Sequence, residues 1–188
     1  TGNNTIVTAT NGHPYNLSTM GMSSGKWYFE TKIISTVGSS MDLVGITDHI
    51  MTTNIDELGQ DNYSYAYIGD GDVRSNGTGV DSGTTYTTGD IISVAVDLTN
   101  SKLYFAKNGT WINSGDPTSG ATGTGATSIQ AVASTGTGVY QFGVGDWSGS
   151  ASGTYSTNFG NGYFGTTAVT SAEADDAGIG AMEYDVPA

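Results

Sequence analysis

The chain has 188 residues, of which 29 are glycine and 36% are apolar; it contains no cysteine and carries a formal net charge of −13. Without cysteine there can be no disulfides, thiolate metal sites or thiol nucleophiles, and the shortage of cations argues against binding to nucleic acid or anionic membranes. The length fits one domain with a substantial core, and the many Gly and Thr residues favour an all-β fold.

The first part of the chain predicts three strands separated by turn signals. Residues 5–10 (TIVTAT) are expected to form a short strand. His13-Pro14-Tyr15 is expected to be a loop, because the residue before a proline is pushed out of the helical region. A turn at Ser23-Ser24-Gly25 leads into a strand over residues 26–35, with residues 41–47 as its antiparallel return. We assign no strand between the loop and the turn.

The next part is richer in turns. Residues 49–62 are irregular and polar, with one turn of helix expected around residues 54–58. Residues 63–68 (YSYAYI) alternate strictly, which predicts a strand with three tyrosines on one face. Residues 69–83 are turn-rich and contain a short strand around residues 73–75.

Residues 89–111 carry the clearest pattern of the chain. An apolar face alternates with polar residues over Ile92, Val94, Val96 and Leu98. Residues 102–106 return as a second strand, and Asn108-Gly109 is the dipeptide best suited to the positive φ angles of a tight turn. A two-stranded ribbon cannot bury both of its faces, so a second sheet is required.

The last part predicts further strands around a long loop. Residues 113–128 form a low-complexity surface loop. Residues 129–134 and 139–144 are expected to be strands, residues 145–149 a loop, and residues 154–159 the closing strand.

The end of the chain differs in composition from the rest. Residues 161–188 include five acidic residues and no basic one. We therefore divide the chain into a β-sandwich over residues 1–160 and an acidic extension over residues 161–188. The extension is expected to pack on the sandwich or to lead into a missing segment, and the chain to be a processed product or a fragment.

Three segments resemble the SPRY domain family. They are residues 25–30 (GKWYFE) with Val44-Gly45-Ile46 after them, residues 86–109 around the central ribbon, and residues 155–160 (YSTNFG). Their order and spacing agree with the family over about residues 20 to 160, and the central ribbon is the specific part.

This resemblance implies a bent antiparallel β-sandwich of the concanavalin-like kind, with loops gathered at one end. SPRY domains are binding modules, so the resemblance also implies a protein without catalytic activity or cofactor. The end of the chain resembles SPRY-like domains in structural proteins of marine bacteriophages. The function expected on this basis is a capsid-decoration, tail or fibre surface domain in the virion or outside the cell.

The expected partners are other virion proteins or a host-surface glycan, and a homo-oligomer is compatible with this interpretation. Two alternatives stay open. One is a SPRY protein-interaction adaptor outside any virus, and the other is a secreted carbohydrate-binding module.

Aromatic side chains near predicted turns are the candidate ligand contacts. Asp146 and Trp147 fall where the resemblance places a ligand-binding loop, and Tyr63 and Tyr65 fall near another. Trp111 follows the Asn-Gly turn and is a further candidate, although the core is its preferred interpretation. For the tyrosines the competing interpretation is ordinary cross-strand packing, and for Trp147 it is folding back onto the sheet edge.

Catalytic and metal motifs are weak in comparison. The two histidines have no metal-binding spacing, and there is no GxSxG nucleophile motif. Asp56 and Glu57 are adjacent, so they do not flank a sugar from both sides as glycosidase carboxylates do. Asp70, Asp72 and Asn76 offer hard oxygens at alternate positions, as a calcium loop does, but the bidentate Glu is missing. An ordinary acidic turn is the preferred interpretation.

Overall fold

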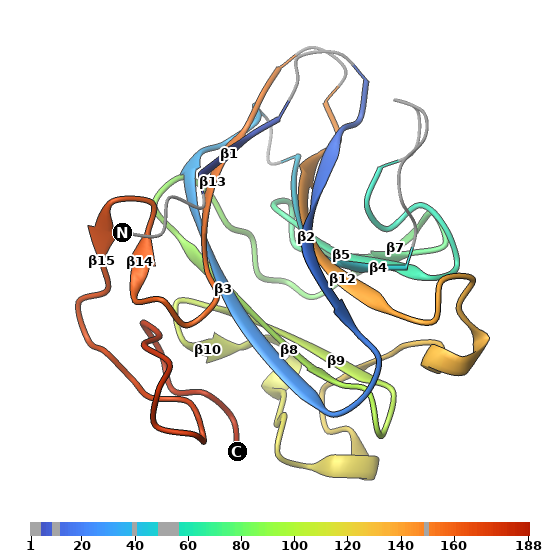
Figure 1. The fold of residues 1–188 in the computed structure, drawn as a ribbon. Helices are drawn as coiled ribbons and strands as arrows, with labels where there is room; N and C mark the ends of the chain where they lie inside the picture. Colours follow the sequence, from blue (N-terminus) through green and yellow to red (C-terminus); the bar gives the residue numbers. More distant parts are fainter. Residues whose placement is uncertain (1–4, 9–11, 39–40, 49–56, 149–150) are drawn as a thin grey trace.

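The fold is a sandwich of two antiparallel sheets (Figure 1), which confirms the predicted all-β class. The computed structural model describes residues 5–8, 12–38, 41–48, 57–148 and 151–188. Within these ranges no helix is long and apolar enough to cross a membrane. The helical elements described there are short 3₁₀ turns: η1 (Ile112–Ser114), η2 (Gly120–Thr122) and η3 (Val132–Ser134).

The first sheet, sheet A, is built around the predicted central ribbon. Its strands, in spatial order, are β1 (Thr5–Val7), β13 (Thr154–Asn158), β3 (Lys26–Ser35), β8 (Ile91–Asp97), β9 (Lys102–Lys107) and β10 (Thr110–Trp111). The short strand β11 (Thr127–Ser128) also pairs with β9. Asn108 and Gly109 join β9 to β10 with φ angles of 48° and 78°, as the sequence predicts for a tight turn.

The second sheet, sheet B, packs over sheet A. Its strands, in order, are β2 (Tyr15–Met22), β12 (Tyr140–Asp146), β4 (Asp42–Thr47), β5 (Ser64–Ile68), β6 (Asp72–Ser75) and β7 (Thr78–Asp81). The chain crosses between the sheets after β3. The two strands predicted to pair with each other, β3 and β4, therefore belong to different sheets.

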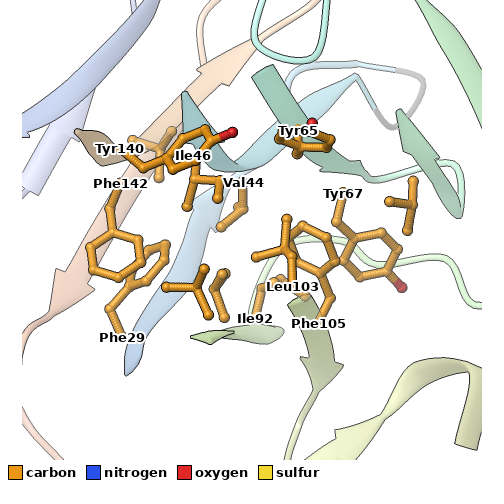
Figure 2. Close-up of a cluster of buried hydrophobic side chains, with 14 of the residues drawn as sticks. Phe29, Val44, Ile46, Tyr65, Tyr67, Ile92, Leu103, Phe105, Tyr140 and Phe142 are labelled. Atoms are coloured by element: carbon orange, nitrogen blue, oxygen red, sulfur yellow. The ribbon is translucent and has the colours of Figure 1, made fainter. Parts of the chain in front are cut away.

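The core lies between the two sheets. Figure 2 shows its labelled side chains, which are Phe29, Ile92, Leu103 and Phe105 from sheet A and Val44, Ile46, Tyr65, Tyr67, Tyr140 and Phe142 from sheet B. The predicted apolar face of the central ribbon is buried in this core. Burying one such side chain contributes about 1.5–3 kcal/mol to the free energy of folding.

Sheet B is covered on its outer face as well. Tyr15, Leu43, Leu58, Ala66 and Ile68 form a second buried cluster there. Because side chains alternate along a strand, β5 sends Tyr65 and Tyr67 into the main core and Ala66 and Ile68 outward. The segment that carries Leu58 provides the cover, and no sequence pattern predicted it.

Several secondary-structure predictions need correction. The sequence analysis assigned no strand to residues 15–22, yet β2 forms there because β12 supplies its ladder partners. Residues 129–134 form no strand, since the main chain of Gln130 bonds to the hydroxyls of Tyr65 and Tyr140 rather than to a neighbouring strand. The predicted loop at residues 145–149 begins later, because β12 continues to Asp146. The first predicted strand is observed over Thr5–Val7.

The C-terminal segment, residues 161–188, lies beside sheet A (Figure 1). It contains a small ribbon of β14 (Tyr163–Phe164) and β15 (Thr167–Ala168). The buried carboxylate of Glu30 on β3 accepts the backbone N–H groups of Glu183 and Tyr184 at 2.8 and 2.9 Å. Burial raises the pKa of Glu30, and these hydrogen bonds partly offset that effect.

Candidate binding site

Trp147 directly follows β12 at one end of sheet B. Its backbone N–H donates to the carbonyl of Met41, which precedes β4, at 2.9 Å. The side chain stays 37% exposed although most large apolar side chains of the described residues are buried. One side of the indole faces the guanidinium of Arg74, whose central carbon lies 4.3 Å from the ring centroid. This is a cation–π contact, and it holds an exposed aromatic ring in one orientation.

Arg74, the sole arginine of the sequence, supports that ring from below. It lies on β6 directly opposite Ala66 of β5, so its side chain extends over the outer face of sheet B. The residue is only 8% exposed. Its Nη2 forms an ion pair with Oε1 of Glu57 at 2.8 Å and donates to Oε1 of Gln60 at 2.9 Å. Its Nη1 is buried with no hydrogen-bond acceptor among the described residues, so the indole face is its compensating contact.

Glu57 connects this group to the start of β2. Its second oxygen, Oε2, lies 3.4 Å from Nδ1 of His13. The carboxylate is buried, and it therefore needs the cation of Arg74 to offset its desolvation. We refer to His13, Glu57, Gln60, Arg74 and Trp147 as the Arg74 cluster. Its members come from four separate parts of the chain.

Beneath Trp147 lies a pair of buried carboxyl groups. Asp146, the last residue of β12, is the direct cross-strand partner of Asp42, the first residue of β4. Both residues are fully buried. Burial raises the pKa of Asp42 to about 6, against hydrogen bonds from Tyr155 and Val37 that lower it. Burial also raises the pKa of Asp146.

The structure brings only some of the predicted contacts together. Asp146 and Trp147 are at the Arg74 cluster, with Asp146 below the surface. Tyr65 is 4% exposed in the core, and Tyr63 packs against the core at the start of β5, so ordinary packing is the better interpretation of the tyrosine row. The Tyr65 hydroxyl donates to the carbonyl of Asn62.

Trp111 lies elsewhere. It is half-buried on β10, edge-on to Tyr28 at 6.5 Å and to Tyr104 at 6.4 Å between ring centroids. These rings lie on the outer face of sheet A, so the preferred core interpretation of Trp111 is wrong. Because Trp147 belongs to the other sheet, the sandwich separates the two tryptophans.

The predicted calcium-loop residues form a turn and a hairpin. Asp70 Oδ1 accepts the backbone N–H of Asp72 at 3.1 Å, and Asn76 adopts a φ of 50° in the turn that joins β6 to β7. No group of three or more His, Asp or Glu side chains is placed to hold a metal in the described ranges. Of the two adjacent acids that the sequence analysis rejected as a glycosidase pair, Glu57 belongs to the Arg74 cluster, and Asp56 lies outside the described residues.

Two hollows occur away from Trp147. One of about 530 Å³ lies between the outer face of sheet A and the C-terminal segment, lined by Trp27, Tyr28 and Tyr104 among others. Another of about 480 Å³ lies where the edges of the two sheets part, between β1 and β2. Both are lined mainly by apolar groups. The first hollow also carries the charged side chains of Lys26, Asp97 and Asp175. The Arg74 cluster differs from both hollows in presenting an exposed indole beside the exposed residue Gln60.

Sequence reasoning gave Arg74 no role and did not predict its ion pair with Glu57. One sequence feature could have pointed to Arg74. A single arginine in a strongly acidic chain is expected to form an ion pair with one of the many carboxylates. Spacing could not select Glu57, because the partner comes from the segment that covers the outer face of sheet B. That cover is a tertiary feature.

Comparison with known proteins places this architecture in a family. The family model for the SPRY domain matches residues 26–130, more than half of the chain. The chain belongs to the SPRY domain family. Ran-binding protein 9 of Danio rerio is 40% identical over 88 residues, which cover 45% of this chain and 14% of that protein. Ran-binding protein 9 of Homo sapiens is 39% identical over 88 residues, covering 45% of this chain and 12% of that protein.

The chain thus corresponds to a small part of these relatives. The crystal structure of the SPRY domain of human HERC1 superposes with a TM-score of 0.60 at 16% identity, covering 82% of this chain and 87% of that one. This agreement confirms the SPRY fold. Both Ran-binding proteins and HERC1 come from animals, so they give no support to the expected phage setting.

Proposed function

We propose that this SPRY domain is a protein-interaction module whose binding surface is centred on Trp147. The observation that carries the proposal is an exposed indole stacked on a buried, ion-paired arginine. An aromatic ring already held in place loses little conformational freedom on binding, and such rings dominate interface energetics. The occupant is a segment of a partner protein, and the role is not enzymatic.

Membership of the SPRY family supports this adaptor-like role over the virion role that was expected from the resemblance of the chain end to phage structural proteins. The name of Ran-binding protein 9 describes binding to Ran, and we do not transfer that partner to this chain. A virion or extracellular location, contact with virion proteins or host glycans, and assembly into a homo-oligomer stay predictions.

The test uses a displayed library of random linear peptides, selected on the whole chain. Selected peptides are then measured against Trp147→Ala and against Met20→Ala, because Met20 has the same 37% exposure and lies on β2. Trp147→Ala should weaken binding by about tenfold or more, equivalent to about 1.4 kcal/mol. Met20→Ala should leave it within about twofold, the range of a near-neutral contact.

Urea unfolding of both variants shows whether a loss of binding reflects a loss of folding. Peptides that bind all three proteins equally would contradict the proposal. A glycan array that gives binding where no peptide does would instead identify a carbohydrate-binding module.

A further inference from the structure

The two carboxyl groups beneath Trp147 face one another across neighbouring strands. Asp42 and Asp146 are directly opposite in the antiparallel ladder between β4 and β12. Directly opposite residues point to the same face, with Cβ atoms about 4.5–5.5 Å apart. Their neighbours Val44 and Val144 lie in the core, so both aspartates point inward, between the sheets.

One oxygen of each carboxyl group is satisfied and the other is not. Asp42 Oδ1 accepts the Tyr155 hydroxyl at 2.9 Å and the backbone N–H of Val37 at 3.1 Å. Asp146 Oδ1 accepts the backbone N–H of Ser148 at 3.0 Å. The Oδ2 atoms of both residues are buried and have no hydrogen-bond partner among the described residues.

The groups packed around the pair cannot neutralise two charges. Tyr155 on β13 is a neutral donor because burial raises its pKa, and the Tyr86 hydroxyl donates to the backbone carbonyl of Asp42 at 2.7 Å. A hydrogen bond from the Thr8 side chain, and more weakly the charge of His13, favour the ionised form of Asp146 and partly offset the effect of burial on its pKa. Over the described ranges, no lysine or arginine forms an ion pair with either aspartate. Two buried carboxylates on directly opposite residues are not both expected to stay ionised without such a partner.

We propose that Asp42 and Asp146 share one proton in an Oδ2–H···Oδ2 hydrogen bond, and that this bond positions Trp147. The bond joins the end of β12 to the start of β4. The hydrogen bond from Trp147 N–H to the Met41 carbonyl joins the same two strands one residue further on. Both aspartates are therefore positioning residues. An effect on partner binding depends on the proposed function, whereas the shared proton and the placement of Trp147 do not.

The arrangement makes the position of Trp147 depend on pH. Loss of the shared proton leaves two like charges on neighbouring strands, which repel and part the strand ends that carry the indole. The pKa of Asp42 of about 6 puts this change close to neutral pH. The pair titrates as a unit, so the transition belongs to both residues together.

The test compares the wild-type chain with Asp42→Asn. The asparagine Oδ1 can still accept from Tyr155 and Val37, and its Nδ2–H takes the place of the shared proton at every pH. Asp185→Asn is the matched control, because Asp185 is an exposed acid in the C-terminal segment. Three measurements are made between about pH 5 and pH 8, a range that brackets the expected transition.

The first measurement is carboxyl ¹³C NMR, in which the Asp42–Asp146 pair should titrate with a midpoint near the Asp42 pKa of about 6. The second is thermal unfolding, in which the wild-type chain and Asp185→Asn should each lose about 3–5 °C relative to Asp42→Asn as the pH rises. The third is acrylamide quenching of Trp147, taken as the difference from Trp147→Phe. It should increase with pH in the wild-type chain and stay constant in Asp42→Asn.

Ionisation of both carboxyl groups already at the acid end of this range, or a Tm of Asp42→Asn that follows the wild-type chain, would refute the shared proton. A normal titration with constant quenching of Trp147 would refute the positioning role. None of these measurements needs a ligand. Failure of the proposed function appears separately, as the absence of peptides whose binding depends on Trp147.

Discussion

Removal of the Glu57 carboxylate is the sharpest test of how Trp147 is supported. Arg74 and Glu57 are 8% and 6% exposed, and their charged atoms lie 2.8 Å apart. Glu57→Ala leaves the guanidinium buried without its counter-charge. Breaking a buried ion pair in this way costs about 3–5 kcal/mol of unfolding free energy.

The remaining contacts of Arg74 reduce that cost. Gln60 still accepts one hydrogen bond, and the Trp147 ring still faces the cation. These two contacts contribute about 1 kcal/mol each, so Glu57→Ala should lower the unfolding free energy by about 1–3 kcal/mol. The double variant Glu57→Gln with Arg74→Met removes both charges and keeps the volume. It should cost about 2 kcal/mol less than the sum of its single substitutions.

Urea unfolding at pH 7, followed by tryptophan fluorescence, measures these differences. Lys107→Met is the control, because Lys107 pairs with Asp90 at 3.1 Å in a more exposed site. Loss of an exposed pair should cost less than about 1 kcal/mol. The reasoning is refuted if Glu57→Ala costs no more than the control, or if the two single substitutions add without coupling.

Two further predictions concern the C-terminal segment. Glu30→Ala leaves the backbone N–H groups of Glu183 and Tyr184 without their acceptor. Amide hydrogen exchange at these two residues should therefore accelerate about tenfold or more, with Asp185→Ala as the control. Unchanged exchange rates would show that the Glu30 carboxylate does not hold the C-terminal segment. Gly109→Ala should lower the unfolding free energy more than Gly89→Ala. Both glycines have positive φ angles, but a Cβ at Gly109 would lie 2.7 Å from Tyr184 Cδ1, whereas one at Gly89 meets nothing within 4 Å. Gly89→Ala should cost about 1–2 kcal/mol in urea unfolding, and an equal cost for both variants would contradict packing of Tyr184 on the turn.

Strands with strong local patterns could be predicted from the sequence. The strand over residues 26–35 is observed with the predicted bounds, and the ribbon over residues 89–111 forms with its apolar face in the core. In both cases the alternation of side chains and the turn residues specify the structure locally. The all-β class followed from the same signals.

Strands that depend on a distant partner could not be predicted. The β2 strand contains Asn, Ser, Thr and Gly, which give little local preference, and it is held by β12 from the far end of the chain. The pairing of β4 was predicted wrongly for a related reason. Nothing in residues 36–41 indicates that the chain crosses to the other sheet there.

The candidate site shows the same division. The residues at Asp146 and Trp147 could be selected from an aromatic in a turn-rich stretch together with the family resemblance. The residues around them could not be predicted. Arg74 and Glu57 form their ion pair only because the segment that carries Glu57 packs on the outer face of sheet B.

For this protein, alternation and turn chemistry along the chain determined the fold class and the central ribbon, because these depend on neighbours a few residues apart, and the resemblance of three sequence segments indicated the family. Tertiary structure alone decided which exposed indole has a buried cation beneath it and which two buried aspartates lie opposite each other on neighbouring strands. Those contacts join residues separated by up to about a hundred positions, as Asp42 and Asp146 are, and only sheet pairing brings such positions together.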